Sequence, residues 1–471
     1  MQVVDKVYID GVFVRPHGTA TFDLISPVNQ ELLGKLTLAD ATDTQSAIAA
    51  AREAFKSWSQ TTKEERIQYL EKMYAAILKR KQHLIDVMVK EYGGPLSFSS
   101  VSMQFALDSI TSNIALLKQF DFEKKAGNTI VQLDPVGVVG IITPWNASNG
   151  FICTKLSTAL AAGCTAVIKP SEMSALQTQA LTECLHEAGL PRGVFNIVTG
   201  LGPEVGAELT RNPGIAKISF TGSTAVGKSI ARDGAETMKR VTLELGGKSP
   251  NIILNDADLS KAIPISVAAA FMNSGQACIA GSRLLVPEYQ LEEVKTRLKK
   301  AVADIKVGYP ADPGTDIGPM VSKKQYERVQ GYIKAGIEEG AELLVGGPGH
   351  PEGLESGNFV KPTIFVNVKN DMRIAREEIF GPVLSVLTYK TEEEAIDIAN
   401  DTTYGLTAYI QGEDAEKTRR IAARLEAGRV AINGFKHDPM APFGGFKQSG
   451  IGREYGEYGL EAYLEPKAIL V

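Results

Sequence analysis

The sequence predicts an α/β fold built on mostly parallel sheets. From residue 136 onward, short runs rich in β-branched residues alternate with helical stretches, and the alternation restarts after Gly246-Gly247. Parallel strands that are covered by helices on both faces show this apolar, alternating texture. The sequence therefore predicts two α/β units, the first of them a doubly wound domain of the kind that binds nucleotides.

The individual elements follow from hydrophobic periodicity. Two helices are expected before the first unit, at residues 40–58 and 63–91. Within the first unit we expect strands at 138–142, 166–168, 194–198 and 217–220, separated by helices at 151–162, 175–188 and 203–212. In the second unit we expect strands at 251–254, 284–286, 364–366, 383–387 and 430–432, and helices at 288–305, 322–340, 392–400 and 414–426. Glycines and prolines in 346–357 indicate a surface loop.

Charge and hydropathy argue against two classes of partner. The formal net charge of −5 disfavours nucleic acid, which binds basic surfaces. No apolar run reaches the roughly 18 residues of a membrane span, so no membrane partner is expected. Residues 1–6 lack the basic and apolar regions of a signal peptide, and the expected location is therefore the cytoplasm.

Cysteine and histidine usage gives no sign of a disulfide framework or a metal site. The four cysteines form no C-x-x-C pair, and the five histidines are scattered along the chain. Neither an H-E-x-x-H motif nor a Cys/His cluster is present. We therefore expect no metal.

The segment Gly222–Ser229 matches the phosphate-binding pattern G-x-x-x-x-G-K-[ST] between a predicted strand and a predicted helix. Taken alone, the match suggests a nucleoside triphosphatase with Asp256 as the partner carboxylate. The pattern itself states only that small residues leave backbone N–H groups to meet an anion at a helix N-terminus. A dinucleotide pyrophosphate meets that requirement equally well, so the motif leaves both ligands open. Gly200–Gly206 has one residue too many for the dinucleotide pattern G-x-G-x-x-G, and a turn at a helix start also explains it.

Three residues have side chains suited to catalysis. Cys278 follows a helix and a turn of small residues, so its thiol either faces a cleft or has the buried apolar role of most cysteines. Glu244 ends an apolar strand before paired glycines, and it is either an ion-pair partner or a base whose pKa is raised by burial. Asn146 follows the strand 138–142, at the end where open α/β sheets bind ligands. Its amide either donates to an oxyanion or forms a turn.

Together these segments resemble the aldehyde dehydrogenase superfamily over nearly the whole chain. The motifs that carry the resemblance are Pro144-Trp145-Asn146, Lys169-Pro-Ser-Glu172, Phe220-Thr-Gly222-Ser-Thr, Glu244-Leu-Gly-Gly-Lys248, Gly275-Gln-Ala-Cys278, Glu377-Glu378-Ile-Phe380-Gly-Pro382, Asn400 with Tyr404-Gly405-Leu406, and Pro442-Phe-Gly-Gly-Phe-Lys447-Gln-Ser449-Gly450. Because so many motifs occur in the family's order, chance agreement is negligible. The phosphate-loop match is then explained, since Gly222–Gly227 corresponds to the family's pyrophosphate loop.

The resemblance implies oxidation of an aldehyde to a carboxylic acid with NAD+, through a thiohemiacetal and a thioester on Cys278. In that cycle the thiolate attacks the aldehyde carbonyl, and the Asn146 amide and the Cys278 backbone N–H hold the oxyanion. Hydride transfer to the nicotinamide leaves the thioester, and Glu244 activates the water that hydrolyses it. Lys155 is implied as a supporting polar residue near the site.

The same resemblance assigns the cofactor NAD, with NADP as the alternative, to the first α/β unit. Lys169 and Glu172 are assigned to the adenosine ribose, and Ser223 with the helix N-terminus after it to the pyrophosphate. Glu378 is assigned to the nicotinamide ribose, and Phe380 packs beside the ring. The remaining cofactor positions are Thr143, Trp145, Gly202, Gly206, Phe220, Gly222, Gly227 and Leu245. Because Glu172 meets a 2′-phosphate with like charge, we expect NAD to be preferred.

The family's fold implies three parts for this chain. Residues 1–119 and 139–246 are expected to form the cofactor-binding domain, and residues 247–445 the catalytic domain. Residues 120–138 and 446–471 are expected to form a small β region for oligomerisation. Alternating apolar residues between Tyr463 and Leu470 predict an edge strand that pairs with a neighbouring subunit. We therefore expect a homodimer or a homotetramer, with a small-molecule aldehyde as the other partner.

The expected mouth of the aldehyde site departs from many relatives. Ala147-Ser148 stands where many relatives have Phe-Pro, Thr154 stands where an aromatic is common, and the loop 434–440 is polar and particular to this chain. Smaller, hydroxylated side chains predict a roomier or more polar aldehyde pocket, unless Phe151 and Phe435 refill the space. The sequence does not identify the aldehyde.

Two rival functions stay open at this point. A CoA-acylating semialdehyde dehydrogenase passes the acyl group to CoA instead of water, and Glu244 counts against it because such relatives typically lack that base. A non-catalytic family member used for binding has no physical need for Cys278, Glu244 and Asn146 together. Turnover with and without CoA separates these alternatives.

Overall fold

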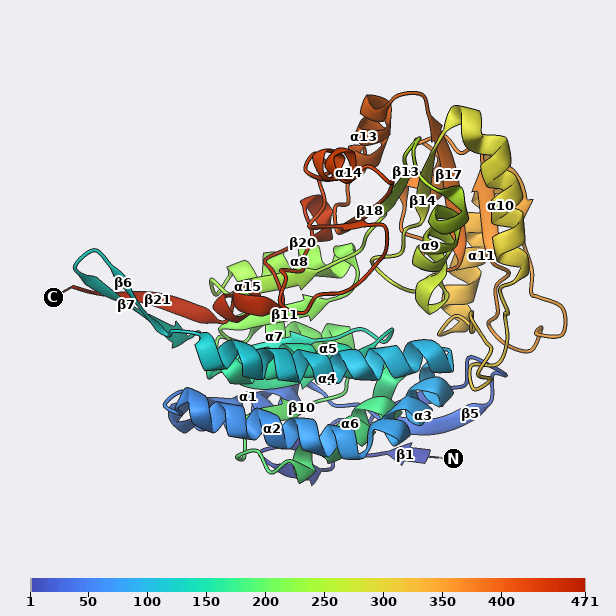
Figure 1. Cartoon of the computed structure of the whole chain (residues 1–471). Coiled ribbons are helices and arrows are strands. Elements are labelled where there is room, and N and C mark those ends of the chain that lie inside the picture. Colours follow the sequence, from blue (N-terminus) through green and yellow to red (C-terminus); the bar gives the residue numbers. More distant parts are fainter. Residues whose placement is uncertain (1, 471) are drawn as a thin grey trace.

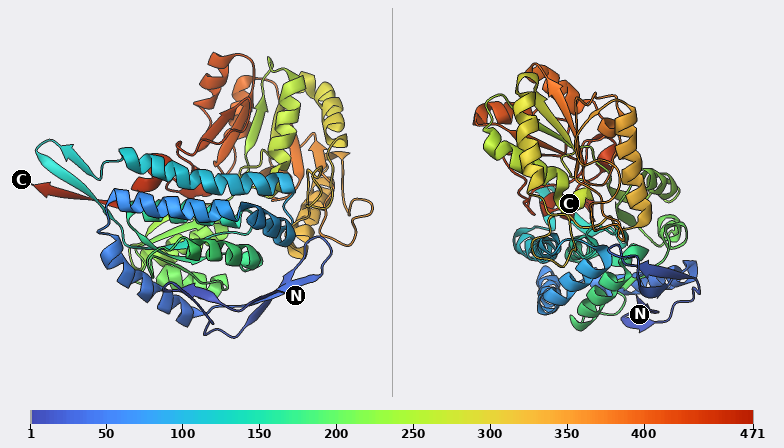
Figure 2. Two further views of the ribbon diagram at one scale, coloured as in Figure 1. Left: turned by 60° about the horizontal axis from the view of Figure 1, so that its bottom comes forward. Right: turned by 90° about the vertical axis from the view of Figure 1, so that its right-hand side faces the viewer.

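The computed structural model describes residues 2–470 and confirms the predicted α/β class. Two large sheets, each covered by helices, form two lobes that meet along one side (Figure 1). A narrow ribbon of strands extends away from the first lobe and carries the C-terminal end of the chain (Figure 2). The strands predicted for the two α/β units are all present close to their predicted bounds.

The sheet of the first lobe has the strand order β20-β12-β11-β8-β9-β10-β2-β3. Its central strands run parallel: β12 (Arg240–Glu244), β11 (Lys217–Thr221), β8 (Val138–Ile142), β9 (Thr165–Lys169) and β10 (Phe195–Ile197). Antiparallel strands complete its edges: β20 (Gly450–Ile451), β2 (Val7–Ile9) and β3 (Val12–Val14). The chain runs from β8 to β9 and β10 on one side and returns to β11 and β12 on the other. This change of direction places a ligand crevice at the carboxyl ends of β8 and β11.

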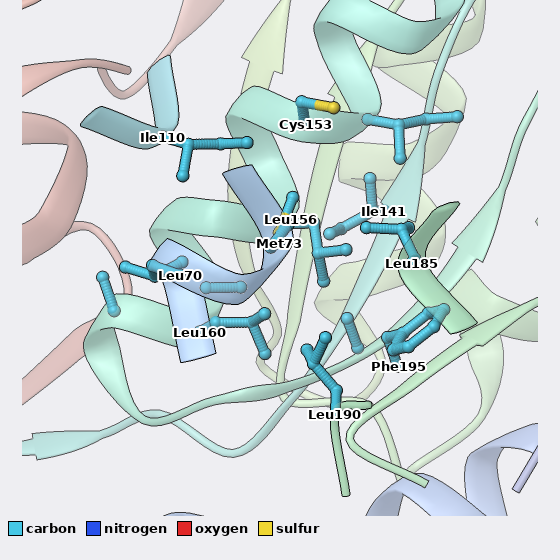
Figure 3. Close-up of a cluster of buried hydrophobic side chains, with 14 of the residues drawn as sticks. Leu70, Met73, Ile110, Ile141, Cys153, Leu156, Leu160, Leu185, Leu190 and Phe195 are labelled. Carbon is cyan, nitrogen blue, oxygen red and sulfur yellow. The ribbon is translucent and has the colours of Figure 1, made fainter. Parts of the chain in front are cut away.

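Helices cover both faces of this sheet because its strands alternate apolar side chains between two cores. In β8, Val139 and Ile141 join the core with α2 (Lys63–Lys79), α4 (Leu96–Gln119), α5 (Ser148–Ala162) and α6 (Ala175–Glu187). Val138 and Ile142 join the core with α1 (Ala41–Trp58), α7 (Ala207–Arg211) and α8 (Thr224–Ala235). Figure 3 shows part of the first core, which contains Leu156 and Leu160 of α5 together with Ile141 of β8.

The sheet of the second lobe is parallel except for one edge. Its strand order is β15-β16-β17-β14-β13-β18-β19, with bounds β15 (Glu342–Val345), β16 (Thr363–Val366), β17 (Val383–Tyr389), β14 (Arg283–Pro287), β13 (Pro250–Ile253), β18 (Thr407–Gln411) and β19 (Arg429–Ile432). One face packs on α9 (Leu259–Phe271) and α10 (Leu291–Ala303). The other packs on α11 (Lys323–Glu338), α12 (Arg373–Arg376), α13 (Glu392–Asn400) and α14 (Ala415–Ala422). The loop predicted at 346–357 joins β15 to β16.

The structure differs from the predicted elements at several places. The helix expected at 63–91 divides at Arg80 into α2 and α3 (Lys81–Tyr92), and the Arg80 guanidinium at this break pairs with Glu183 and Glu187 of α6. The segment expected as a helix at 203–212 begins as a π-helix over Gly202–Gly206. The prediction omitted α4, β18 and the N-terminal strands, among which β1 (Gln2–Val4), β5 (Leu32–Thr37) and β4 (Thr21–Ile25) form a separate small sheet.

Serine content explains why α4 escaped prediction. Serine has modest helix propensity because its hydroxyl competes for backbone hydrogen bonds. In α4 the hydroxyls of Ser100, Ser109 and Ser112 instead bond back within the helix, as when Ser100 donates to the Leu96 carbonyl at 2.7 Å. Packing against α2 and α5 then outweighs the weak local preference.

The ribbon joins two distant segments in the antiparallel order β21-β7-β6. Its strands are β6 (Glu123–Ala126), β7 (Thr129–Pro135) and β21 (Leu464–Leu470), which follows α15 (Gly456–Glu461). The strand β20 also lies within 446–471, but it pairs with β12 of the first lobe. How the chain divides into domains, and the role of the ribbon in oligomerisation, stay predictions.

The described residues contain neither a membrane-spanning helix nor a metal-binding group of side chains. None of the helices in residues 2–470 combines the length and apolarity needed to cross a bilayer. The same residues contain no group of three or more His, Cys, Asp and Glu side chains arranged to hold a metal ion.

The exposed outer edge of β21 generates a prediction about assembly. Along residues 2–470, β21 pairs only with β7, and Leu470 at its end is 82% exposed. An apolar edge strand of this kind favours pairing with another chain. A chain that ends at Leu464 should therefore lose mass in light scattering relative to the full chain and keep its far-UV circular dichroism. A full chain that is monomeric, or a shortened chain of unchanged oligomeric mass, would contradict this prediction.

Candidate active site

A cavity of about 210 Å³ lies where the carboxyl ends of the first sheet face the second lobe. The first lobe contributes residues that follow β8, β11 and β12, and α5 adds Phe151. The second lobe contributes the loop after α9, one end of α11 and the segment before β17. The cavity therefore lies at the crevice that the strand order predicts.

The cavity brings together many of the predicted site residues and leaves others around it. Its lining includes Trp145, Asn146, Gly222, Ser223, Glu244, Leu245, Cys278, Glu378 and Phe380. The predicted residues outside this lining are Thr143, Lys155, Lys169, Glu172, Gly202, Gly206, Phe220 and Gly227. The lining also contains Pro144, Phe151, Thr221, Gly246, Gln325 and Arg328, which the sequence analysis did not assign to the site.

A tight turn holds Cys278 at the end of α9. Asn273, Ser274 and Gly275 have φ angles of 51°, 57° and 72°, a left-handed conformation that is uncommon for residues with side chains. The turn is secured by hydrogen bonds, because the Ser274 hydroxyl accepts from the Gly318 N–H at 2.9 Å. A Cβ on Gly275 would lie 2.2 Å from the Gly381 backbone, so only glycine fits this position.

Gln276 connects this turn to both lobes. Its side-chain oxygen accepts from the Val321 N–H at 3.0 Å, and its amide donates to the Tyr92 hydroxyl at 3.1 Å. Its backbone carbonyl accepts from the amides of Asn273 at 3.0 Å and Asn146 at 2.9 Å. These contacts fix the position of Cys278 two residues later.

Cys278 differs from the other cysteines in exposure. Cys153, Cys164 and Cys184 are fully buried, whereas Cys278 is partly exposed and lines the cavity. Cys153 lies within α5. Burial, followed by the charges of Glu378 and Glu244, raises the pKa of the Cys278 thiol to about 12. The thiol is therefore protonated near neutral pH, and its reaction as a nucleophile requires a base.

Glu244 is buried at the end of β12 with its carboxyl group facing the cavity. Neither carboxyl oxygen has a hydrogen-bond partner among the described residues. Burial and the neighbouring Glu454 raise the pKa of Glu244 well above its ordinary value. A buried carboxylate without donors is a strong base, because its charged form is poorly stabilised.

Lys155 lies behind Glu244 and does not line the cavity. Its ammonium group pairs with Glu454 and donates to the Ser219 hydroxyl at 3.1 Å. The charge of Lys155 opposes the rise in the Glu244 pKa. This arrangement fits the supporting role that the resemblance implied.

Asn146 lines the cavity beside Cys278. One N–H of its amide donates to the Gln276 carbonyl at 2.9 Å, which fixes the orientation of the side chain. An amide group has two N–H donors, so the second remains for an oxygen at the reacting carbon. The arrangement can supply an oxyanion donor.

The loop after β11 presents a helix N-terminus to the cavity. Ser223 caps α8 by accepting from the Val226 N–H, and Gly222 and Ser223 line the cavity. A Cβ on Gly222 would lie 2.4 Å from the ring of Phe220, and one on Gly227 would lie 2.4 Å from Leu245. Glycine at both positions therefore lets these side chains pack closely against the backbone.

The lysine of the triphosphate-loop pattern faces away from this site. Because α8 begins at Thr224, Lys228 lies beyond its first turn, and its ammonium donates to the Gln448 side chain at 2.9 Å. Asp256 is the partner carboxylate that a nucleoside triphosphatase would need. It follows a strand of the second lobe, and its carboxylate accepts from the Asp414 N–H at 2.8 Å. These positions do not form a triphosphate site.

Residues assigned to the adenosine end surround the end of β9. Lys169 and Glu172 pair at 3.6 Å, and the Lys169 carbonyl accepts from the Thr143 N–H at 3.1 Å. A Cβ on Gly206 would approach Lys169 at 3.7 Å, and one on Gly202 would meet open space. The pair therefore faces a region lined by small residues.

Glu378 and Phe380 form the opposite wall of the cavity. Glu378 accepts from the Gly247 N–H at 3.1 Å, and burial raises its pKa. Phe380 has a φ of 62° and packs edge-on against Trp145 at 5.4 Å. Its carbonyl accepts from Gln325 at 2.8 Å, which offsets the cost of this backbone conformation.

Gln325 and Arg328 were missed because the sequence carries no local signal for them. Their separation of three positions places them on one face of α11, and the Arg328 guanidinium donates to the Glu378 carbonyl at 2.6 Å. A polar helix face normally indicates solvent exposure, and only the contact between the lobes turns this face toward the cavity.

The polar residues expected at the aldehyde mouth do not line the cavity in the structure. The Thr154 hydroxyl hydrogen-bonds to Ser109 at 2.7 Å, and neither Thr154 nor Ser148 lines the cavity. Phe151 of the same helix supplies an aromatic wall instead. In the loop 434–440, His437 packs edge-on against Phe105 at 4.9 Å.

Comparison with known proteins points to one family. Residues 13–469 match the model of the aldehyde dehydrogenase family. A 3-succinoylsemialdehyde-pyridine dehydrogenase from Pseudomonas sp. is 45% identical over 467 residues, which cover 99% of this chain and 98% of that protein.

Solved structures agree along the whole chain. A variant of aldehyde dehydrogenase C from Pseudomonas syringae, solved with NAD+ and octanal, matches with a TM-score of 0.98 and 45% identity over 99% of this chain and 96% of that chain. An aldehyde dehydrogenase from Mycobacterium tuberculosis, solved with NAD+, matches with a TM-score of 0.97 and 40% identity over 100% and 98% of the two chains.

Proposed function

The chain belongs to the aldehyde dehydrogenase family, and we propose that it oxidises an aldehyde to a carboxylic acid with NAD+ through a covalent intermediate on Cys278. The observation that carries this proposal is the arrangement of one cavity. It places a thiol, a buried carboxyl group and an amide donor at one end, with the helix N-terminus at Ser223 and the wall at Glu378 in the same space.

The first step is addition of the Cys278 sulfur to the aldehyde carbon. Because the thiol holds its proton near neutral pH, a neighbouring base must accept that proton, and Glu244 is the candidate that faces the same cavity. The free N–H of the Asn146 amide and the Cys278 backbone N–H donate to the oxygen that gains charge.

Loss of hydride from the thiohemiacetal carbon leaves a thioester on Cys278, and Glu244 releases the thiol proton to solvent. The step that follows is hydrolysis of this thioester. Glu244 removes a proton from water, which then attacks the acyl carbon and releases the acid from Cys278. The raised pKa of Glu244 makes its carboxylate a strong base for this step. The ion pair between Lys155 and Glu454 lies near Glu244, and the charges of both residues act on its carboxyl group.

The residues around the cavity fit a dinucleotide. Gly222 and Ser223 line the cavity beside the α8 N-terminus, where a pyrophosphate binds favourably. Lys169 and Glu172 would hold the adenosine ribose, and Glu378 the nicotinamide ribose. When bound, NAD+ supplies the hydride acceptor for the oxidation.

The arrangement of the cavity favours hydrolysis over both rival functions. CoA acylation needs no general base for water, yet Glu244 lies buried in the cavity with Cys278. A protein used only for binding has no use for a buried carboxyl group without partners, since such a group costs stability. We therefore propose the hydrolytic reaction.

The preference between the two cofactors depends on Glu172. We expect kcat/KM for NAD+ to exceed that for NADP+ by at least about tenfold, which corresponds to roughly 1.4 kcal/mol of charge repulsion. Glu172→Gln should narrow this ratio by raising kcat/KM with NADP+. Glu236→Gln, a change at an exposed residue after α8, should leave the ratio unchanged. A wild-type enzyme that favours NADP+ would overturn the assignment.

Turnover should require Cys278 and none of the buried cysteines. Cys278→Ala should lower aldehyde-dependent NADH formation by at least about 10⁴-fold, because it removes the nucleophile. Cys153→Ala and Cys184→Ala should retain most of the activity, since both thiols are fully buried in packing positions. Substantial activity of Cys278→Ala with octanal or a shorter aldehyde would contradict the covalent mechanism.

Loss of Glu244 should block acid release more than acylation. General base catalysis contributes about 10²–10⁴-fold, so steady-state kcat of Glu244→Gln should fall within that range. Rapid mixing should still show a burst of NADH of up to one equivalent per active site, smaller to the extent that Glu244 also accepts the thiol proton, followed by a slow phase. Mass spectrometry should then find the acyl group on Cys278.

The result for Glu244→Gln also separates its two proposed roles. If Glu244 acts mainly by accepting the thiol proton, the burst disappears along with turnover, although NAD+ still binds. That outcome would place Glu244 before the thioester and contradict its role as the base for hydrolysis. Cys278→Ala serves as the control that gives neither burst nor adduct.

A further inference from the structure

An arginine and a group of aromatic rings lie near Cys278 outside the cavity described above. Arg429 is the first residue of β19, and its guanidinium carbon lies 5.5 Å from the centre of the Phe443 ring. The ring centres of Phe443 and Tyr455 are 5.7 Å apart, and those of Tyr455 and His437 are 5.0 Å apart. Together with Phe105, which packs on His437 and Tyr455, these rings are called the aromatic cluster (Phe105, His437, Phe443 and Tyr455).

Arg429 has unused hydrogen-bonding capacity. Within residues 2–470 no ion pair joins it to a carboxylate, and its Nε is buried with no hydrogen-bond partner. One terminal nitrogen reaches the His437 Nδ1 at 3.4 Å. Burial, followed by the charge of Arg429, lowers the pKa of His437 to about 4, so its ring is neutral near pH 7 and offers no counter-charge.

Arg429 lies close enough to the reacting centre for its charge to act there. Its charge opposes the rise in the pKa of the Cys278 thiol, and the Tyr409 hydroxyl beside it donates to the Ile279 carbonyl, one residue after Cys278. The loop next to the cluster is exposed, since Phe435 and Met440 are 42% and 40% exposed.

We propose that Arg429 is a specificity-determining residue that binds a carboxylate at the far end of the aldehyde substrate. An arginine presents parallel N–H donors that match the two oxygens of a carboxylate, and this pairing satisfies the buried Nε. The apolar stem of the substrate packs against the aromatic cluster while its aldehyde reaches Cys278. The inference rests on the proposed function and names its substrate class as aldehydes with a terminal carboxylate, which this reaction converts to dicarboxylates.

A purely electrostatic role for Arg429 has a different consequence. If the guanidinium acts only by favouring the Cys278 thiolate, its loss slows every aldehyde by a similar factor. Binding of a carboxylate instead affects only substrates that carry one. The two roles are therefore separated by comparing substrates that differ only at the far end.

The test uses 4-oxobutanoate, its methyl ester and butanal as a matched series. Wild-type kcat/KM should be at least about tenfold higher for 4-oxobutanoate than for the ester or butanal. Arg429→Gln should lower kcat/KM for 4-oxobutanoate by about 10–100-fold, mainly through KM, since a hydrogen bond to a charged group contributes that much. Rates with the ester and butanal should change less than about threefold. The kcat/KM of Arg429→Lys for 4-oxobutanoate should lie between the wild-type and Arg429→Gln values, because lysine keeps the charge and loses the paired donors.

A matched control and a binding measurement complete the test. Arg424→Gln removes an exposed arginine that pairs with Glu393, and it should leave the substrate ratios unchanged. Succinate should inhibit butanal oxidation by the wild-type enzyme, and Arg429→Gln should weaken this inhibition at least about tenfold. The binding measurement does not depend on turnover of the carboxylated aldehyde.

Two outcomes overturn the inference. One is a wild-type enzyme that oxidises butanal as well as 4-oxobutanoate. The other is an Arg429→Gln variant whose kcat/KM falls by the same factor with all three aldehydes. In both cases the enzyme still oxidises aldehydes, so the proposed function stands. Failure of the wild-type enzyme to reduce NAD+ with any aldehyde would instead contradict the proposed function.

Discussion

The site depends on the hydrogen bonds that hold the turn before Cys278 between the two lobes. Gln276 links α3 through Tyr92, the start of α11 through Val321 and the end of β8 through Asn146. The turn adopts left-handed backbone angles at Asn273 and Ser274, which cost free energy unless surrounding contacts secure them. Because the thiol and its oxyanion donor come from different lobes, this set of bonds sets the distance between them.

The electrostatics of the cavity follow from burial. Glu244 and Glu378 are carboxyl groups with raised pKa values in the same cavity as the thiol, and desolvation is the largest cause of each shift. Protein interiors rarely keep such groups unless they serve a function, because an unpaired charge is costly to bury. Two cations oppose these shifts: the charge of Lys155 acts on Glu244 and the charge of Arg429 acts on the thiol.

Local patterns predicted most of the two sheets. Strands such as β8 and β11 are continuous apolar runs, and such runs are typical of parallel sheets covered on both faces. The catalytic candidates Cys278, Glu244 and Asn146 could be identified because each interrupts an expected pattern: a thiol after a glycine turn, a carboxyl group in an apolar strand, an amide at a strand end. Helix α4 and the N-terminal strands were not predicted, since their stability comes from packing against distant segments and their own residues carry weak signals.

The sequence by itself determined the α/β class, the family resemblance and the identity of the residues suited to chemistry, because these depend on local periodicity and on residue type. Only the tertiary structure decided which of those residues share a cavity. Glu172 and Lys169 lie outside the lining, whereas Gln325 and Arg328 enter it from a helix that the sequence presents as polar and solvent-facing. The same holds for Arg429, whose surroundings come from α4, the loop 434–440 and the segment before α15. Contacts between residues hundreds of positions apart depend on how the two lobes pack, and no local pattern records that packing.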